Sequence, residues 1–128
     1  MEYVKDGALA EQSLRFAARV LSLSTQLQKS GDFIVSKQVG KSGTSIGANI
    51  REAQYASSRA DFAAKLHIAL KEANETAYWL DLLRLTEEIT EAEYASLLSD
   101  CRSIRAMLVA SIKTAKAGIT TEKKDSQQ

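Results

Sequence analysis

His67 and Cys101 are the residues of this chain best suited to metal binding or nucleophilic catalysis. Each is the only residue of its type among 128, so the sequence offers neither a histidine pair for a metal nor a local cysteine–histidine signature. By helical spacing, His67 falls with Lys71, Asn74 and Tyr78, off the main apolar stripe of its segment. We expect His67 to lie at a surface or an interface and Cys101 to be a small core residue.

A phosphate-binding loop is a second kind of site to consider, because residues 39–45 read VGKSGTS. That motif needs a glycine five residues before its Gly-Lys-Ser and a strand ahead of the loop. Val35 occupies the glycine position, and no strand is indicated. Gly40, Gly43 and Gly47 each cost up to about 1 kcal/mol relative to alanine inside a helix. Close approach of a neighbouring helix explains the three glycines better than a nucleotide does.

The carboxylates Glu72, Glu75 and Asp81 fall on one predicted helix and are the remaining candidates for a metal site. Metal sites in helical bundles usually combine a glutamate with a Glu-x-x-His motif from paired helices. That motif does not occur in this sequence. We therefore expect no metal, no cofactor and no enzymatic activity.

The composition predicts one globular domain in the cytoplasm. Apolar residues make up 45% of the chain, there is no proline, and 17 Lys and Arg face 16 Asp and Glu. Uninterrupted helices with short connections are typical of a proline-free chain. The beginning of the chain lacks the pattern of a signal peptide, and no apolar run approaches membrane-spanning length. We expect no membrane partner.

Apolar residues recur at spacings of three and four, which predicts helices over about residues 8–29, 33–56, 58–85 and 90–118. In the first of these helices, Leu14 and Leu21 widen the core-facing stripe, as expected for a helix inside a bundle. Short connections predict an all-α, antiparallel, up-down-up-down four-helix bundle. The bundle domain should span residues 1–118, with Gly118 ending the last helix and residues 119–128 forming a disordered tail.

Small and polar residues of the second predicted helix form a candidate contact surface. Its glycines can admit either a neighbouring helix or another subunit, while a polar ribbon runs beside them at spacings of four and three. Polar groups in such a position can fix register or mediate subunit contact. The predicted oligomer or partner interface comprises Gly40, Gly43, Ser45, Gly47, Asn49, Glu52 and Tyr55.

Charge is distributed unevenly along the nearly neutral chain. Residues 60–100 carry 3 basic and 9 acidic side chains, whereas residues 101–128 carry 6 basic and 2 acidic ones. Basic patches that add up in an oligomer would attract phosphates, although solvated helix faces also explain such charges. The candidate nucleic-acid-binding residues are Arg15, Arg19, Lys37, Lys41, Arg102, Arg105, Lys113 and Lys116.

The central part of the chain resembles a known family. The matching residues are Gln38, Ser45-Ile46-x-x-Asn49-Ile50-x-Glu52-Ala53, Arg59-x-x-Phe62, Leu66-x-Ile68-Ala69-x-x-x-Ala73-x-Glu75 and Tyr78-Trp79-Leu80. This pattern is similar to the bacterial four-helix-bundle family first described as open reading frames in intervening sequences of large-subunit ribosomal RNA. The family is similar in turn to the accessory variability determinant of diversity-generating retroelements.

The resemblance implies a four-helix bundle that assembles as a homopentamer and has no known enzyme activity. It also implies contact with nucleic acid and with a nucleic-acid-processing protein, a reverse transcriptase in the retroelements. The retroelement protein is strongly basic, whereas the present chain has a net charge of only +1. Two functions follow as expectations: a homo-oligomeric scaffold or adaptor, and alternatively an RNA- or DNA-binding accessory protein.

Overall fold

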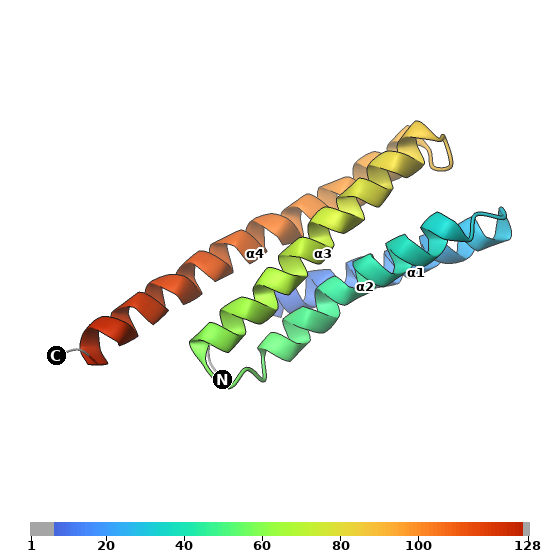
Figure 1. Cartoon of the computed structure of the whole chain (residues 1–128). Coiled ribbons are helices and arrows are strands. Elements are labelled where there is room, and N and C mark those ends of the chain that lie inside the picture. Colours follow the sequence, from blue (N-terminus) through green and yellow to red (C-terminus); the bar gives the residue numbers. More distant parts are fainter. Residues whose placement is uncertain (1–6, 127–128) are drawn as a thin grey trace.

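Four helices make up almost all of the chain. The computed structural model describes residues 7–126, with α1 at Gly7–Lys29, α2 at Ile34–Ala53, α3 at Arg59–Leu85 and α4 at Glu91–Ser126. Consecutive helices run antiparallel and pack side by side (Figure 1). The prediction of an all-α, up-down-up-down four-helix bundle is confirmed.

One apolar core receives side chains from all four helices, because each helix carries buried residues at spacings of three and four. These spacings place the side chains on one face of each helix, and the four faces meet along the bundle axis. The largest fully buried side chains are Leu9, Phe16, Val20, Leu27, Val39, Ile46, Ile50, Leu66, Leu80, Leu83, Ile104 and Leu108.

Helices α1 and α2 approach each other closely at Gly43. A Cβ placed on Gly43 would lie only 2.6 Å from Cγ1 of Val20, which is fully buried. Nearby, the buried hydroxyls of Ser24 and Ser36 each donate a hydrogen bond to the other residue's backbone carbonyl, at 2.9 and 2.8 Å. The missing side chain and the reciprocal hydrogen bonds together fix the register of the α1–α2 hairpin.

Local capping explains where the helices begin. Gly31 turns the chain with a φ of 88°. Asp32 follows it, and the Asp32 carboxylate accepts a hydrogen bond from the backbone N–H of Val35 at 2.9 Å. At α4, the backbone N–H of Glu93 donates to the Thr90 hydroxyl and that of Thr90 to the Glu93 carboxylate, at 3.1 and 3.2 Å. These contacts satisfy backbone donors at the beginnings of α2 and α4, as a side-chain cap and a capping box do.

The predicted end of the last helix at Gly118 is wrong, because α4 continues to Ser126. Gly118 lies against the guanidinium group of Arg59, which a Cβ at this position would overlap. Nε of Arg59 lies 2.9 Å from the Glu122 carboxylate, and Ile119 packs against the core. Residues 119–126 are therefore helical rather than a disordered tail, and residues 1–6 and 127–128 of the predicted ranges lie outside the described residues.

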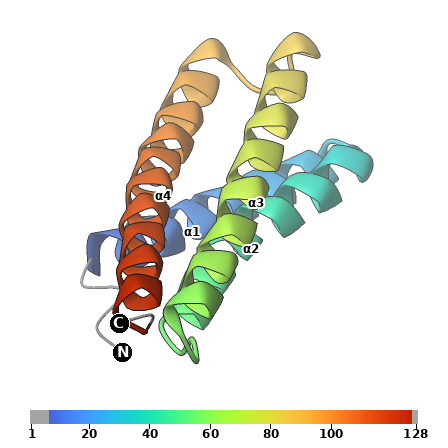
Figure 2. The same ribbon diagram turned by 60° about the vertical axis from the view of Figure 1, so that its left-hand side comes forward.

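The two hairpins diverge toward their turns. Helices α1 and α4 contact each other much less than do helices adjacent in the chain, and the α1–α2 pair leans away from the α3–α4 pair (Figure 2). This divergence leaves space between α1 and α4 at the end of the molecule that holds both hairpin turns. Within residues 7–126, no helix has the length and apolarity needed to span a bilayer.

The variant Gly43→Ala should destabilise the fold by about 1 to 2 kcal/mol. Overpacking a buried contact costs about 1 to 3 kcal/mol, and the better helix propensity of alanine offsets part of that. Guanidinium unfolding measures the change. Gly7→Ala is the control, because its added Cβ meets no atom within 4 Å and should cause no loss. Unchanged or increased stability of Gly43→Ala would contradict the close packing at Val20.

Candidate functional site

The predicted interface residues of α2 separate into two groups. Gly40 and Gly43 are buried in the α1–α2 contact, and so they offer no surface to another chain. This corrects their assignment to an interface: the close approach that they permit occurs within the chain. The other five, Ser45, Gly47, Asn49, Glu52 and Tyr55, are partly or fully exposed, and for them the interface stays a prediction.

The polar ribbon is stabilised by hydrogen bonds along its own helix. The Ser45 hydroxyl donates to the carbonyl of Lys41 at 2.7 Å, and the Asn49 amide donates to the carbonyl of Ser45 at 2.8 Å. Both side chains are half-buried, while Tyr55, just beyond α2, is 84% exposed. The ribbon therefore presents aligned polar groups, with an aromatic ring free in solvent at its end.

A shallow groove runs along the outer side of the α1–α2 hairpin. It encloses about 350 Å³ and is lined by Ala10, Ser13, Leu14, Ala17, Thr44, Gly47, Ala48, Arg51 and Glu52. Leu14 is 60% exposed and Leu21, two turns further along α1, is 54% exposed. The prediction that these leucines widen the core stripe is wrong, since the core lies on the opposite flank of α1. They form an outward apolar face together with exposed Ala18.

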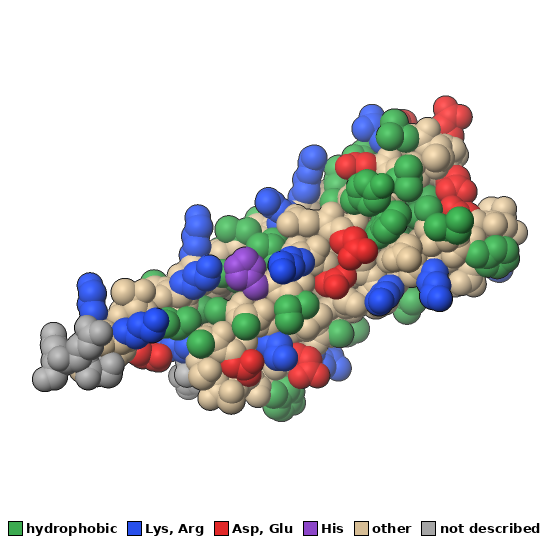
Figure 3. Space-filling view, in the orientation of Figure 1, with side chains coloured by type: hydrophobic (Ala, Val, Ile, Leu, Met, Phe, Trp, Pro, Cys, Tyr) green, Lys and Arg blue, Asp and Glu red, His purple; other side chains and the backbone are tan. Residues whose placement is uncertain are grey.

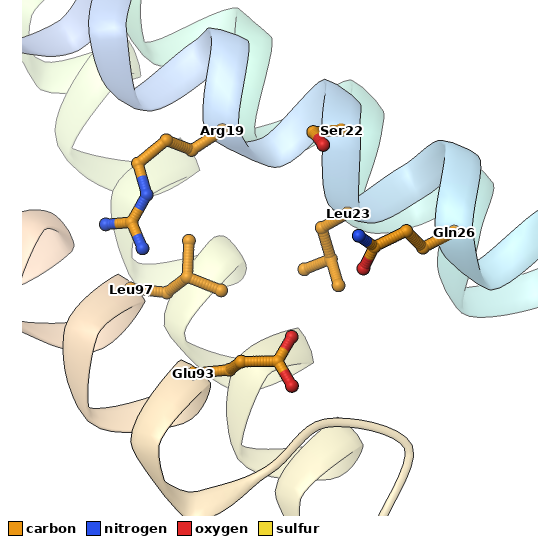
Figure 4. A pocket seen from close by; sticks show the side chains of 6 residues that line it. All are labelled: Arg19, Ser22, Leu23, Gln26, Glu93 and Leu97. Carbon is orange, nitrogen blue, oxygen red and sulfur yellow. The ribbon is translucent and has the colours of Figure 1, made fainter.

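A second hollow of about 200 Å³ lies between the diverging helices α1 and α4. Figure 4 shows Arg19, Leu23 and Gln26 of α1 on one side of it, with Glu93 and Leu97 of α4 on the other. The Arg19 guanidinium extends past this hollow and donates to Asp100 at 2.6 Å and to Ser96 at 2.9 Å. These contacts make Arg19 a bridge between the two hairpins.

Neither His67 nor Cys101 is placed for catalysis. His67 is exposed on α3, and Cys101 is buried, with its thiol donating to the carbonyl of Ala73 at 3.4 Å. Burial raises the pKa of the Cys101 thiol to about 11, which keeps it protonated and unreactive at neutral pH. Both predictions, a surface histidine and a core cysteine, are confirmed. Among the described residues, no three His, Cys, Asp or Glu side chains gather as they would around a metal ion.

Two carboxylates of α3, Glu72 and Glu75, lie beside each other. Desolvation raises the pKa of Glu72 above its ordinary value, the neighbouring Glu75 adds to this effect, and Lys41 of α2 opposes it. Glu75 also accepts a hydrogen bond from the Trp79 indole at 3.3 Å. Glu72 and Glu75 are thus a small acidic patch on the surface of α3.

Two carboxyl groups meet where the hairpin turns face each other. Glu88, in the α3–α4 turn, is hydrogen-bonded to Asp32 in the α1–α2 turn, and this bond raises the pKa of Glu88 above its ordinary value of 4.5. Desolvation and repulsion by Asp32 act in the same direction. Ionisation of Glu88 beside Asp32 is therefore unfavourable, and protonation of Glu88 relieves the repulsion.

The eight candidate nucleic-acid-binding residues fall on three helices. Arg15 pairs with Glu11 at 2.8 Å and Arg19 with Asp100, whereas Lys37 and Lys41 are exposed on α2. The remaining four share the exposed side of α4, where Lys and Arg side chains gather along the upper edge of the view in Figure 3. These four residues are Arg102, Arg105, Lys113 and Lys116.

Comparisons with known proteins agree with this architecture. Residues 5–110 match the family model described as "23S rRNA-intervening sequence protein". The chain is similar to a solved structure from Bacteroides thetaiotaomicron, described as a protein with unknown function from the S23 ribosomal protein family. Sequence identity is 52% and the TM-score 0.81, with 83% of this chain and 99% of that one covered. A search of the curated proteins gave no match.

The variant Glu88→Gln should raise the melting temperature at pH 7 relative to the parent chain. Because the folded pKa of Glu88 is raised, its contribution to stability is complete below the pKa of an unfolded glutamate and is lost as pH rises through the folded pKa. Glutamine does not ionise, so the variant does not lose this stability as the pH rises. The difference in melting temperature between variant and parent should therefore shrink toward pH 4.

Thermal denaturation between pH 4 and pH 7 measures this difference. Glu87→Gln is the control, since it removes an equal charge from the same turn. An equal shift in both variants, or a lower melting temperature of Glu88→Gln at pH 7, would contradict an unfavourable interaction of ionised Glu88 with Asp32.

Proposed function

We propose that this chain, which belongs to the 23S rRNA-intervening sequence protein family, is a non-enzymatic scaffold or adaptor that assembles with copies of itself. The observation that carries the proposal is the outward apolar face of α1, which includes Leu14 and Leu21 beside the α1–α2 groove. Two leucines more than half exposed on one helix face, next to a groove lined by small residues, are typical of a protein–protein contact.

A second apolar face supports assembly as a closed ring. On the outer side of α3, Ile68 is 42% exposed and Tyr78 is 57% exposed, and the Tyr78 ring packs edge-on against Trp79 at 4.9 Å between centroids. Figure 3 shows hydrophobic side chains gathered over α3, with acidic ones beside them. A ring needs two different patches that meet head to tail, and the faces of α1 and α3 supply two.

Charged residues at the edges of these two faces can pair across a contact. Arg15 and Arg51 border the face of α1 together with the acidic Glu11 and Glu52. The face of α3 is bordered by Glu72 and Glu75. Opposite charges at the rim of an interface favour the correct pairing and disfavour contact between two like faces. We propose a ring of five copies, the number that the resemblance to the retroelement accessory protein implies.

The apolar contribution to such a contact is substantial. Burying an exposed leucine side chain stabilises an interface by roughly 1.5 to 3 kcal/mol, and both Leu14 and Leu21 lie on the same face of α1. This gain recurs at every contact of a closed ring. It offsets part of the translational and rotational entropy that each added copy loses on association.

The double variant Leu14→Lys/Leu21→Lys should dissociate the assembly into monomers while leaving each chain folded. Two lysine charges would have to be desolvated in the contact, but both positions are exposed in the isolated chain. Size-exclusion chromatography with light scattering measures the mass, and circular dichroism measures the helix content.

The matched control is Leu85→Lys, which introduces the same change at an 81% exposed leucine at the end of α3. It should leave the mass of the assembly unchanged. A double variant that keeps the mass of the parent would show that the face of α1 is not the contact.

Binding of RNA or DNA is the second proposed function, and one specific observation favours it. Of the eight basic residues predicted to contact nucleic acid, four lie on the same exposed side of α4. Phosphate backbones attract such clustered cations, and the attraction weakens steeply with salt. Copies of α4 in a ring would repeat this basic surface around the assembly.

A further inference from the structure

We propose that the outer face of α4 binds the sugar–phosphate backbone of a double-helical nucleic acid. This inference rests on the second proposed function, nucleic-acid binding, and assigns to it a surface and a class of ligand. The surface is defined by the six basic residues that follow Cys101, and we call it the basic face of α4. It comprises Arg102, Arg105, Lys113, Lys116, Lys123 and Lys124.

The basic face is continuous because its members share one angular sector of the helix. At 100° per residue, the six positions fall within a sector of about 100°. All six are exposed. Arg105 also donates a hydrogen bond to the Asn74 side chain of α3 at 3.0 Å, which marks the edge of the face at the α3–α4 seam.

Between Arg102 and Lys124, no acidic side chain falls in this sector. Of the acidic residues from Asp100 onward, Asp100, Glu122 and Asp125 all fall on the opposite side of α4 by the same helical count. Asp100 pairs there with Arg19, and Glu122 pairs with Arg59. The intervening positions on the basic face hold small or medium side chains, such as Ala106, so the cations add into one uninterrupted field.

The face has the length of a duplex segment. From Arg102 to Lys124, a helix rising 1.5 Å per residue extends about 33 Å, which corresponds to about ten base pairs of B-form DNA. Figure 1 shows α4 extending past the α2–α3 turn as a continuous helix. Basic side chains in a row along such a helix can contact successive phosphates of a duplex without contacting the base edges.

The chemistry of the face favours a duplex over other acidic partners. Single-strand binding relies on aromatic side chains that stack on bases, and α4 has no aromatic residue after Tyr94. A protein interface has an apolar centre, whereas none of the large exposed hydrophobic side chains among the described residues belongs to α4. The face instead offers three pairs of basic residues, at positions 102 and 105, 113 and 116, and 123 and 124.

The part of α4 beyond the family match is fixed in place by the bundle. The match ends at residue 110, and Lys113, Lys116, Lys123 and Lys124 follow it. Arg59, at the beginning of α3, holds this segment by two contacts. It forms an ion pair with Glu122, and its guanidinium group packs against Gly118. The extension therefore prolongs the basic face along the same helix, and it holds four of the six basic residues.

The experiment compares two triple variants of the intact chain that remove equal charge. Lys113→Gln/Lys116→Gln/Lys124→Gln alters the basic face, whereas Lys29→Gln/Lys65→Gln/Arg84→Gln alters basic residues of α1 and α3 that are not among the eight predicted nucleic-acid contacts. Fluorescence anisotropy measures binding to a 20-base-pair RNA duplex, a DNA duplex of the same sequence, the single strands and a poly-glutamate peptide, over a range of salt concentrations. Circular dichroism and light scattering show that fold and assembly persist.

We expect the parent chain to bind a duplex more tightly than the single strands or poly-glutamate. Removing three phosphate contacts should lower the slope of log affinity against log salt by roughly 2 to 3 and weaken binding at least about tenfold at low salt. The control should retain the parent's affinity and slope. The RNA and DNA arms identify which duplex is preferred, and preference for either supports the inference.

Three results would overturn it. An equal loss of affinity in the two triple variants would show that nucleic acid binds at another surface. That result would contradict the role of the basic face but not nucleic-acid binding itself. Equal or tighter binding of single strands or poly-glutamate would remove the duplex as the ligand. No binding of any nucleic acid by the parent chain at low salt would remove both the inference and the second proposed function.

Discussion

The close contact of α1 and α2 at Gly43 is the constraint on which the rest of the molecule depends. Because Gly43 has no side chain, Val20 is buried directly against the backbone of α2, and the Ser24 and Ser36 hydroxyls reach each other's carbonyls. On α1, Leu14 lies outside the buried stripe that includes Val20, and it faces outward. The interior contact and the exterior face through which copies of the chain are proposed to assemble therefore lie on different sides of the same helix.

The sequence was sufficient to predict the helices because their periodicity and caps are local properties. Spacings of three and four define each buried stripe, and residues such as Thr90 act within one turn. The end of α4 was not predictable in this way. Gly118 stops a helix only where the chain beyond it lacks partners, and the partner here, Arg59, lies 59 residues earlier in the sequence.

The candidate site was only partly predictable for the same physical reason. Periodicity gives the width of an apolar stripe but not which flank faces the core, and in the structure Leu14 lies on the flank that faces outward. Likewise, the sequence showed that Gly40 needs a close neighbour but not whether that neighbour is α1 or another chain. The clustering of basic residues on α4, by contrast, was readable because a single long helix determines it.

Self-assembly is the central claim, and native mass spectrometry of the unmodified chain across a range of concentrations tests it most directly. A chain with apolar faces on both α1 and α3 should appear as a closed ring, with the mass of five 14.0 kDa chains and no open series of larger species. A smaller or larger closed ring would correct the number of copies alone. The mass of a single chain at every concentration up to tens of micromolar would contradict the account.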